Sequence, residues 1–361
     1  DYTDTSDGVL LLEKAATNLV TYSEDFSNSY WIKTNTTIQS NSSISPDGTL
    51  NATNLIPSTS SGVHNVKNLT TLTNSYCGGS WFVKANGYSK VSLREDGVFG
   101  RYMSCDLSNG TILDENATTS AEIEEYGNGW YRIKFTDVVV SSGTRISMYV
   151  LPDSYTNGAP NTLNWSGNGT DGVLIFGAML EDASNISSYI PTQGSASTRV
   201  AETANNSGNS EVFNDSQGVL FANISGLDSN STAKAITINQ SSTNILGFYY
   251  YQSRIDAYVK VGTNQFFKTH YLDPTENVKI SLKYKQNDFA LWINGFEVSS
   301  LVGSGITPSG LNKLSFSDLD TNDFYGKTKE IGYYDTALTD LELETLTSYK
   351  SWTSMVNELN L

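Results

Sequence analysis

Cysteine, histidine and positive charge are scarce in this sequence of 361 residues, which has 2 Cys, 2 His and 22 Lys and Arg. Against 38 Asp and Glu, this gives a net charge of −16. Few cations are left to displace the counterions of DNA or RNA, so we expect no nucleic-acid partner. Two cysteines allow one disulfide at most, between Cys77 and Cys105, which excludes a disulfide-dense scaffold. Two buried free thiols are the alternative.

Long hydrophobic runs are absent as well. None approaches the about 20 apolar residues that span a bilayer, so we expect no membrane insertion. The chain has neither a signal peptide nor an initiator methionine, and it opens with Asp1-Tyr2-Thr3-Asp4. We therefore expect a processed form or a fragment of a longer polypeptide.

The residue patterns of hydrolytic enzymes are also missing. His64 and His270 are isolated, and no Gly-x-Ser-x-Gly sequence opens a helix. Glu122, Glu124 and Glu125 lie beside a predicted hairpin turn, which is typical of a solvated face rather than of the paired carboxylates of a glycosidase. We predict no catalytic residues and no enzyme activity.

One acidic loop, residues 318–323, partly resembles a calcium-binding loop. It lacks the Gly at the sixth position and the Glu at the twelfth, where Asp323 and Lys329 stand. The rims of β-sandwiches bind calcium through irregular loops, so a structural calcium ion is left open. No metal ligands are assigned and no other cofactor is predicted.

Serine, threonine, asparagine, glycine and 21 tyrosines fill the composition instead. Asn, Gly and Ser form turns, whereas Tyr, Val and Ile pack on pleated surfaces, so many short strands are expected. Alternating residues in 279–299 predict a meander with turns at Asn287-Asp288 and Asn294-Gly295. A capping box at Thr339-Asp340-Leu341-Glu342 predicts a helix. The predicted fold is all-β, with two tandem antiparallel β-sandwich (jelly-roll) domains and one short C-terminal helix.

Residues 172–200 predict the seam between the two domains. They begin as an apolar strand and continue into a polar stretch, as at the end of a domain. Apolar residues on both faces indicate a strand covered on both sides. One predicted face holds Val173, Ile175 and Met179, and the other holds Leu174, Phe176, Ala178 and Leu180.

The predicted organisation has four parts. Residues 1–17 are a lead segment whose run Val9–Leu12 docks as an edge strand, and residues 18–194 form the first sandwich. Residues 195–210 have no apolar periodicity and are predicted to be a linker, and residues 211–361 form the second sandwich.

Short blocks of sequence carry a resemblance to known families. In one order over residues 9–200 stand NLVTYSEDFSNSYWIK, WFVKA, DLSNGTIL, EEYGNGWYRI, MYVLPDS, GVLIFGAMLED and SYIPTQGSASTR. Together they resemble the carbohydrate-binding-module-like jelly-roll domain common in bacteriophage tail fibres and other virion proteins. The second half, with KISLKYKQNDFALWINGFEV and FYGKTKEIGYYDTALTDLELETL, resembles the concanavalin A-like/laminin G-like sandwich.

The resemblance implies a phage virion protein, a tail fibre or similar surface appendage, that binds host cell-surface glycans non-covalently. It also implies other virion proteins as partners and a homo-oligomer, with a trimer favoured. One alternative is a purely architectural virion part, such as a head fibre or decoration protein. Another is a secreted bacterial adhesin or a binding module attached to a glycanase.

Glycan sites combine aromatic faces, on which sugar rings stack, with amide and carboxylate groups that form hydrogen bonds. The long predicted loop 152–172 has these ingredients, and our candidate glycan-binding residues are Tyr155, Asn164, Trp165 and Asp171.

Other aromatic residues are weaker candidates. Trp31 with Tyr30 is a second candidate site, against the alternative that Trp31, Trp81, Trp130 and Trp292 pack in the core. The run Tyr249-Tyr250-Tyr251 must expose at least one ring, because neighbouring residues of a strand face opposite sides. An exposed Tyr serves a ligand or a subunit interface.

Overall fold

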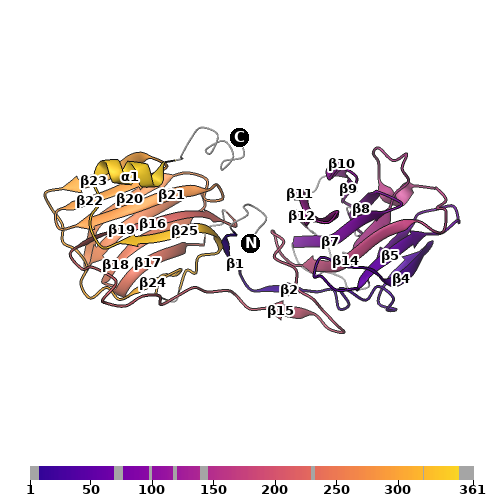
Figure 1. The fold of residues 1–361 in the computed structure, drawn as a ribbon, viewed down its shortest axis with the longest axis horizontal. Helices are drawn as coiled ribbons and strands as arrows, with labels where there is room; N and C mark the ends of the chain where they lie inside the picture. Colours follow the sequence, from indigo (N-terminus) through magenta and orange to yellow (C-terminus); the bar gives the residue numbers. More distant parts are fainter. Residues whose placement is uncertain are drawn as a thin grey trace. The chain divides into compact units, whose positions relative to one another are not determined.

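A computed structural model describes residues 8–68, 76–96, 100–116, 120–138, 145–228, 232–319 and 321–348. The chain divides into two compact units: Ala15–Val200, the N-terminal unit, and Asp1–Lys14 with Ala201–Leu361, the C-terminal unit. Antiparallel strands dominate both units (Figure 1), which confirms the predicted all-β fold. Among the described residues, no helix is long and apolar enough to cross a membrane.

The described part of the N-terminal unit contains two six-stranded sheets, in the orders β10-β9-β8-β13-β6-β3 and β11-β12-β7-β14-β5-β4, and a small sheet of β2 and β15. Its core draws side chains from both large sheets, such as Trp81 and Ile175 from one and Leu93 and Met148 from the other. The strands are β2 (Ala16–Asn18), β3 (Ile32–Thr34), β4 (Thr36–Ser43), β5 (Ala52–Pro57), β6 (Asn65–Lys67), β7 (Tyr76–Asn86), β8 (Lys90–Glu95), β9 (Tyr102–Asp106), β10 (Thr111–Asn116), β11 (Ser120–Glu125), β12 (Trp130–Val138), β13 (Ile146–Val150), β14 (Gly172–Glu181) and β15 (Ser197–Arg199).

Strand β14 is buried along its whole length, as predicted for a strand covered on both sides. The faces differ from the prediction, however, because a β-bulge lies between Phe176 and Met179. Gly177 takes a φ of 60° there, and the extra residue reverses the alternation beyond it. Val173, Ile175, Ala178 and Leu180 therefore face the main core, and Leu174 and Phe176 face the opposite side.

Tyr189 covers that opposite side of β14. Its ring contacts Phe82 and Phe176, with centroids 5.7 and 5.6 Å away. Its hydroxyl shares a hydrogen bond with the Ser23 hydroxyl at 2.7 Å and donates one to Glu24 Oε1 at 2.9 Å. Tyr189 belongs to SYIPTQGSASTR, one of the sequence blocks that carry the family resemblance. This block thus has a structural role, because it covers one side of β14 in the N-terminal unit.

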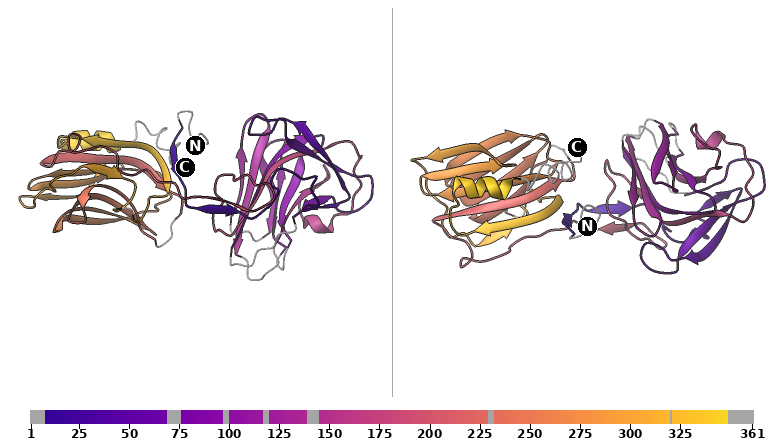
Figure 2. Two further views of the ribbon diagram at one scale, coloured as in Figure 1. Left: turned by 90° about the horizontal axis from the view of Figure 1, so that it is seen from below. Right: turned by 45° about the horizontal axis from the view of Figure 1, so that its top comes forward.

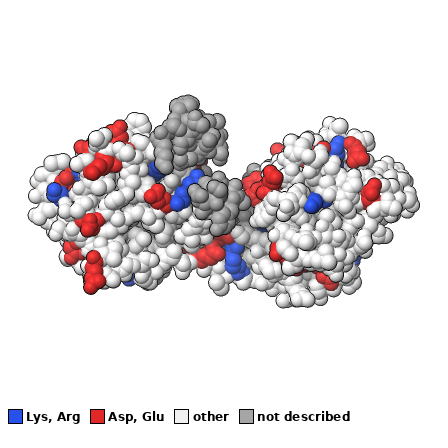
Figure 3. All heavy atoms as spheres, in the orientation of Figure 1, with Lys and Arg blue, Asp and Glu red and all other residues white. Residues whose placement is uncertain are grey.

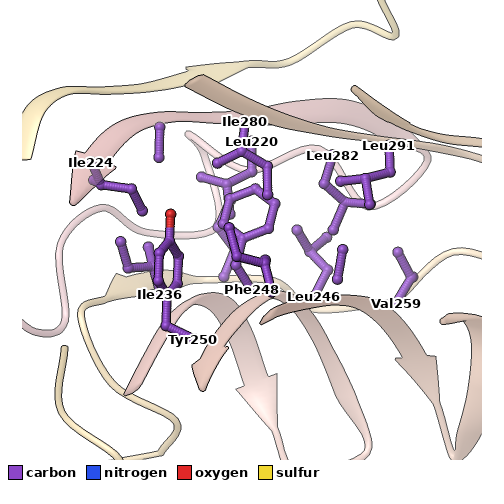
Figure 4. Packing of buried hydrophobic residues seen from close by; sticks show 14 of the residues in the cluster. Leu220, Ile224, Ile236, Leu246, Phe248, Tyr250, Val259, Ile280, Leu282 and Leu291 are labelled. Atoms are coloured by element: carbon purple, nitrogen blue, oxygen red, sulfur yellow. The ribbon is translucent and has the colours of Figure 1, made fainter. Parts of the chain in front are cut away.

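The described part of the C-terminal unit is a sandwich of a six-stranded sheet, β1-β25-β16-β21-β22-β23, and a five-stranded sheet, β20-β19-β18-β17-β24. Figure 4 shows the core between them, where Leu220, Ile280 and Leu282 of the first sheet point toward Phe248 and Leu246 of the second. The strands are β1 (Leu10–Leu12), β16 (Gln217–Gly226), β17 (Lys234–Ser241), β18 (Asn244–Tyr251), β19 (Arg254–Val261), β20 (Thr263–Tyr271), β21 (Val278–Lys285), β22 (Asp288–Ile293), β23 (Phe296–Val302), β24 (Lys313–Ser315) and β25 (Gly326–Tyr334).

A short helix, α1 (Asp340–Thr347), lies on the outer face of the six-stranded sheet (Figure 2). Leu343 packs there against Val219 and Trp292. The capping box is present as predicted: Glu342 N–H donates to the Thr339 hydroxyl, and Thr339 N–H donates to Glu342 Oε2 at 2.8 Å. The helix ends at Thr347, since its C-cap residue Ser348 has an extended backbone.

The N-terminal segment and the predicted linker both take part in sheets. Strand β1 pairs with β25, so the predicted edge strand is confirmed, but it belongs to the C-terminal unit. Strand β15, inside the predicted linker 195–210, pairs with β2. Ser207 and Leu314 exchange backbone hydrogen bonds. The boundaries between the two units therefore fall inside the predicted segments 1–17 and 195–210. Strand pairing across long sequence separations determines these boundaries, and composition does not reveal such pairing.

Cys77 and Cys105 are fully buried and unbonded, so the free-thiol alternative holds. Burial raises the pKa of Cys105 to about 12 and that of Cys77 well above its usual range. Trp31, Trp81, Trp130 and Trp292 are at most 7 % exposed, which confirms their prediction as core residues and removes Trp31 as a glycan candidate. Acidic side chains predominate among the charged groups on the face that Figure 3 shows.

Candidate functional site

The outer face of the five-stranded sheet combines aromatic and charged side chains. On β18 the core takes Leu246, Phe248 and Tyr250, so Tyr249 and Tyr251 face outward. Tyr250 is 1 % exposed, whereas its two neighbours are half-buried, as the alternation of the tyrosine run predicted.

Strand register places these side chains in rows across β18, β19 and β20. Tyr251 pairs with Arg254, Tyr249 with Asp256, and Tyr258 with Phe267. Residues opposite each other in neighbouring strands lie close enough to interact. The rows therefore form one continuous surface rather than scattered exposed groups.

This surface is hollowed into a groove with a volume of about 420 Å³. Ligand pockets in proteins commonly have about 300–1,000 Å³. The groove is lined by Ser242, Ile245, Tyr249, Tyr251, Arg254, Asp256, Tyr258, Lys260, Asn264, Phe267, Asp318 and Leu319. We call this the sheet groove.

Arg254 is fixed at one end of the sheet groove. Its guanidinium lies 4.7 Å from the centroid of the Tyr251 ring, a cation–π contact. Its Nη2 lies 3.3 Å from Asp256 Oδ2, and the other oxygen of Asp256 accepts a hydrogen bond from the Thr269 hydroxyl at 2.6 Å. Three side chains from β18 and β19 are thus held in place before any ligand binds.

The loop after β24 forms a wall of the groove. It is anchored on β17, because the Thr237 hydroxyl donates to Ser317 O at 2.8 Å and Ala235 N–H donates to Asn322 O at 2.8 Å. From this loop Asp318 Oδ2 accepts a hydrogen bond from the Tyr249 hydroxyl. The wall and the floor of the groove are therefore joined directly.

The phenol groups of two tyrosines in the groove stay protonated at physiological pH. Burial, with a further contribution from Asp318, raises the pKa of both Tyr249 and Tyr258 well above that of a free phenol. Their rings stack at a centroid distance of 4.9 Å with an interplanar angle of 16°. Half-buried Tyr249 provides aromatic surface to the groove, whereas Tyr258 is 5 % exposed and packs against the Tyr249 ring.

The charges of the groove are balanced. Arg254 and Lys260 supply two positive charges, and Asp256 and Asp318 supply two negative ones. This balance contrasts with the net charge of −16 on the whole chain. Both carboxylates already accept hydrogen bonds from neighbouring side chains. The arrangement suits the binding of a polyhydroxylated ligand on aromatic rings with polar groups at hand.

The structure places the predicted loop residues in different environments. Tyr155 is 4 % exposed, and its hydroxyl shares a hydrogen bond with Ser104 Oγ at 2.9 Å and donates one to Gly158 O at 2.8 Å. Because the ring lies in a small apolar cluster, it offers no face to a ligand, and the prediction for Tyr155 is not supported.

The other three predicted residues lie at the surface. Trp165 is half-buried, and its ring contacts His64 and Tyr88, with centroids at 4.5 and 5.4 Å. Exposed Asn164 accepts a hydrogen bond from Ser61 Oγ at 2.6 Å, and exposed Asp171 accepts one from Asn168 Nδ2 at 2.6 Å. Trp165, Asn164 and Asp171 stay candidate glycan-binding residues in the N-terminal unit.

His64, one of the two isolated histidines, has a structural role. It is fully buried, and its ring nitrogens lie 2.7 Å from Asn35 O and 3.0 Å from Trp165 O. It therefore ties the Trp165 loop to the strand region near Asn35.

Within the described ranges, no three His, Cys, Asp or Glu side chains gather in a way that could hold a metal ion. Residue 320 of the predicted calcium loop lies outside these ranges, so the structural calcium stays an open expectation.

The sequence predicted at least one exposed ring in the tyrosine run of β18, but it did not identify Arg254, Asp256 or Asp318 as parts of one site. The run Arg254-x-Asp256-x-Tyr258-x-Lys260 alternates with apolar residues, so its outward face could be deduced from the sequence. The partnership with Asp318 could not, because 69 residues separate it from Tyr249.

No protein-family model matches the chain, and no curated protein matches it. Solved structures do. The carbohydrate-binding module CBM40 of the Ruminococcus gnavus IT-sialidase, bound to α2,3-sialyllactose, is 13 % identical over 41 % of this chain and 97 % of that chain, with a TM-score of 0.34. A leech intramolecular trans-sialidase is 15 % identical over 41 % of this chain and 27 % of its own, with a TM-score of 0.35.

A heptameric SAP-like pentraxin from Limulus polyphemus is 15 % identical over 41 % of this chain and 76 % of its own, with a TM-score of 0.33. Identities and TM-scores at this level do not transfer a ligand or an activity to this chain.

Proposed function

We propose that this chain is an adhesive protein that binds a glycan non-covalently through the sheet groove of its C-terminal unit. The observation that carries the proposal is the groove itself, in which Arg254 stacks on Tyr251 and Tyr249 stacks on Tyr258. Pyranose rings have apolar faces that pack on aromatic rings, and hydroxyl groups that need partners such as Asp318 or Lys260.

The biological setting is part of the same proposal and rests on the sequence resemblance. The chain is proposed to belong to a surface appendage of a phage virion, a tail fibre or a similar part, to contact other virion proteins, and to bind a glycan of the host surface. The proposed homo-oligomer, with a trimer favoured, is checked by light scattering of the full chain.

The experiment is a binding screen of the full chain on bacterial surface polysaccharides and their oligosaccharides, followed by variants. Tyr251→Ala and Arg254→Gln should each weaken binding about tenfold or more, since each removes half of the cation–π pair. Phe296→Ala is the matched control, because Phe296 is 75 % exposed on β23 of the other sheet. Its affinity should equal that of the wild type.

Three results would contradict the proposal. Loss of binding in Trp165→Ala, with Tyr251→Ala unaffected, would place the site in the N-terminal unit. Absence of binding to every host glycan would favour the purely architectural alternative. Release of reducing sugar from a bound polysaccharide would contradict non-covalent binding as the sole activity.

A further inference from the structure

Leu319 has an unusual backbone conformation. Within the described residues, eight non-glycine residues have positive φ, and seven of them are asparagines; the eighth is Leu319, with a φ of 50°. Asparagine visits this left-handed region readily, whereas a leucine there places its Cβ against the carbonyl oxygen. Leu319 therefore lowers the stability of the fold at this position.

Another turn in this chain resembles the one that contains Leu319 but uses residues that suit its backbone conformation better. Asp318 and Thr321 exchange backbone hydrogen bonds of 2.7 and 2.9 Å, so two residues connect them. The corresponding turn between β22 and β23 uses Asn294-Gly295, with φ values of 50° and 86°. Asn-Gly is the preferred pair for such a turn. Leu319 takes the position that asparagine has there.

Core packing does not account for the leucine. Leu319 is half-buried and belongs to none of the hydrophobic clusters formed by the described residues. It lines the sheet groove together with Ile245 and Phe267. Strained residues persist where function requires them, and this one places an apolar side chain beside the hydroxyl groups and charges of the groove.

We propose that Leu319 contacts the ligand and determines specificity, and that the ligand presents a methyl group to it. This inference rests on the proposed function of the sheet groove. Glycans carry methyl groups in two forms, at C6 of a 6-deoxy sugar or in an acetamido substituent. Either form would gain from apolar contact with half-buried Leu319, whereas a hydroxyl group in the same position would lose a hydrogen-bond partner.

The first test separates strain from contact. Leu319→Asn relieves the backbone and removes the apolar side chain, so the melting temperature of the C-terminal unit should rise by about 2–4 °C. Its affinity for the glycan should fall about fivefold to tenfold. Leu319→Ala should lose affinity to a similar degree without the rise in melting temperature. Asn287→Leu is the control for the opposite change, from asparagine to leucine, because Asn287 is an exposed turn residue with a φ of 62°. It should lower the melting temperature and leave binding unchanged.

The second test identifies the methyl group on the full chain. Chitotriose and cellotriose differ in acetamido against hydroxyl at C2, and methyl α-L-rhamnoside and methyl α-L-mannoside differ in methyl against hydroxymethyl at C5. Preference for the first member of a pair assigns the acetamido or the 6-deoxy form. No preference in either pair would overturn the ligand assignment.

The outcomes also distinguish this inference from the proposed function. Wild-type affinity in Leu319→Asn, with binding lost in Tyr251→Ala, would overturn the role of Leu319 and leave the groove as the site. A lower melting temperature in Leu319→Asn would overturn the argument from strain. Unchanged binding in Tyr251→Ala would overturn the proposed function itself.

Discussion

The hydroxyl of Tyr249 on β18 donates a hydrogen bond to the carboxylate of Asp318, 69 residues further along the chain. This bond joins the floor of the sheet groove to the loop that forms its wall. Tyr249→Phe should therefore lower the free energy of unfolding of the C-terminal unit by about 1–2 kcal/mol and weaken glycan binding, since the wall loses its direct hydrogen bond to the floor. Urea unfolding and isothermal calorimetry measure the two effects.

The control for stability is Tyr251→Phe. Both tyrosines are half-buried on the same face of the sheet, but no hydrogen bond from the Tyr251 hydroxyl is formed within the described residues. Its removal should leave the unfolding free energy unchanged. Equal losses in the two variants would show that the bond to Asp318 does not anchor the loop.

The two thiols should be inaccessible in the folded protein. Cys77 and Cys105 are fully buried and unbonded, and burial raises the pKa of both well above that of a free thiol. A thiol reagent at neutral pH should therefore titrate neither residue before unfolding and both after it, without added reductant. If the denatured chain releases no thiol until it is reduced, the free-thiol state is wrong.

The bulge in β14 should depend on Gly177. A Cβ there would lie 2.8 Å from Phe82 Cδ2, in addition to the cost of a positive φ. Gly48 also has a positive φ, 84°, but has nothing within 4 Å of the position of a Cβ. We expect Gly48→Ala to cost about 1 kcal/mol of unfolding free energy, and Gly177→Ala about 1–3 kcal/mol more.

Chemical denaturation of the N-terminal unit measures both variants. Equal costs would mean that Phe82 moves aside freely, contrary to the packing around the bulge.

Acid should weaken the C-terminal unit through Asp228. Its carboxylate lies 2.7 Å from the ammonium groups of both Lys14 and Lys234. Burial alone would raise its pKa, but the hydrogen bonds and charges of the two lysines hold the pKa below the usual 3.8. A carboxyl with a lowered pKa in the folded state stabilises the fold above its unfolded pKa and loses this contribution as pH falls through the folded one.

Asp228→Asn should therefore cost about 3 kcal/mol at pH 7, because it removes a carboxylate charge from beside the buried ammonium of Lys234. The difference from the wild type should shrink below about pH 4. A difference that is constant from pH 7 to pH 3 would show that the carboxylate charge plays no part.

Local features of the fold could be predicted from the sequence because their causes are local. The turn Asn294-Gly295 and the capping box of Thr339 with Glu342 depend on residues at most three positions apart. Strand alternation alone predicted that at least one ring of the run Tyr249-Tyr250-Tyr251 is exposed, and the structure shows that Tyr249 and Tyr251 face outward.

Features that depend on distant pairing could not be predicted. The bulge at Gly177 changed which residues of β14 face the core, because an inserted residue does not interrupt an apolar run. Tyr155 looked like a loop aromatic, but Ser104 on β9 accounts for its buried hydroxyl. The sheet groove combines β18, β19 and a loop near residue 318, whose proximity arises only in the folded sheet.

The most direct test of the central claim is to locate a bound glycan on the full chain. Backbone and side-chain NMR shifts, recorded while an oligosaccharide found in the binding screen is titrated in, identify the residues that respond. We predict the largest shifts at Tyr251, Arg254 and Leu319 in the sheet groove. Shifts confined to Trp165 and its neighbours, or no saturable shifts anywhere, would contradict the account.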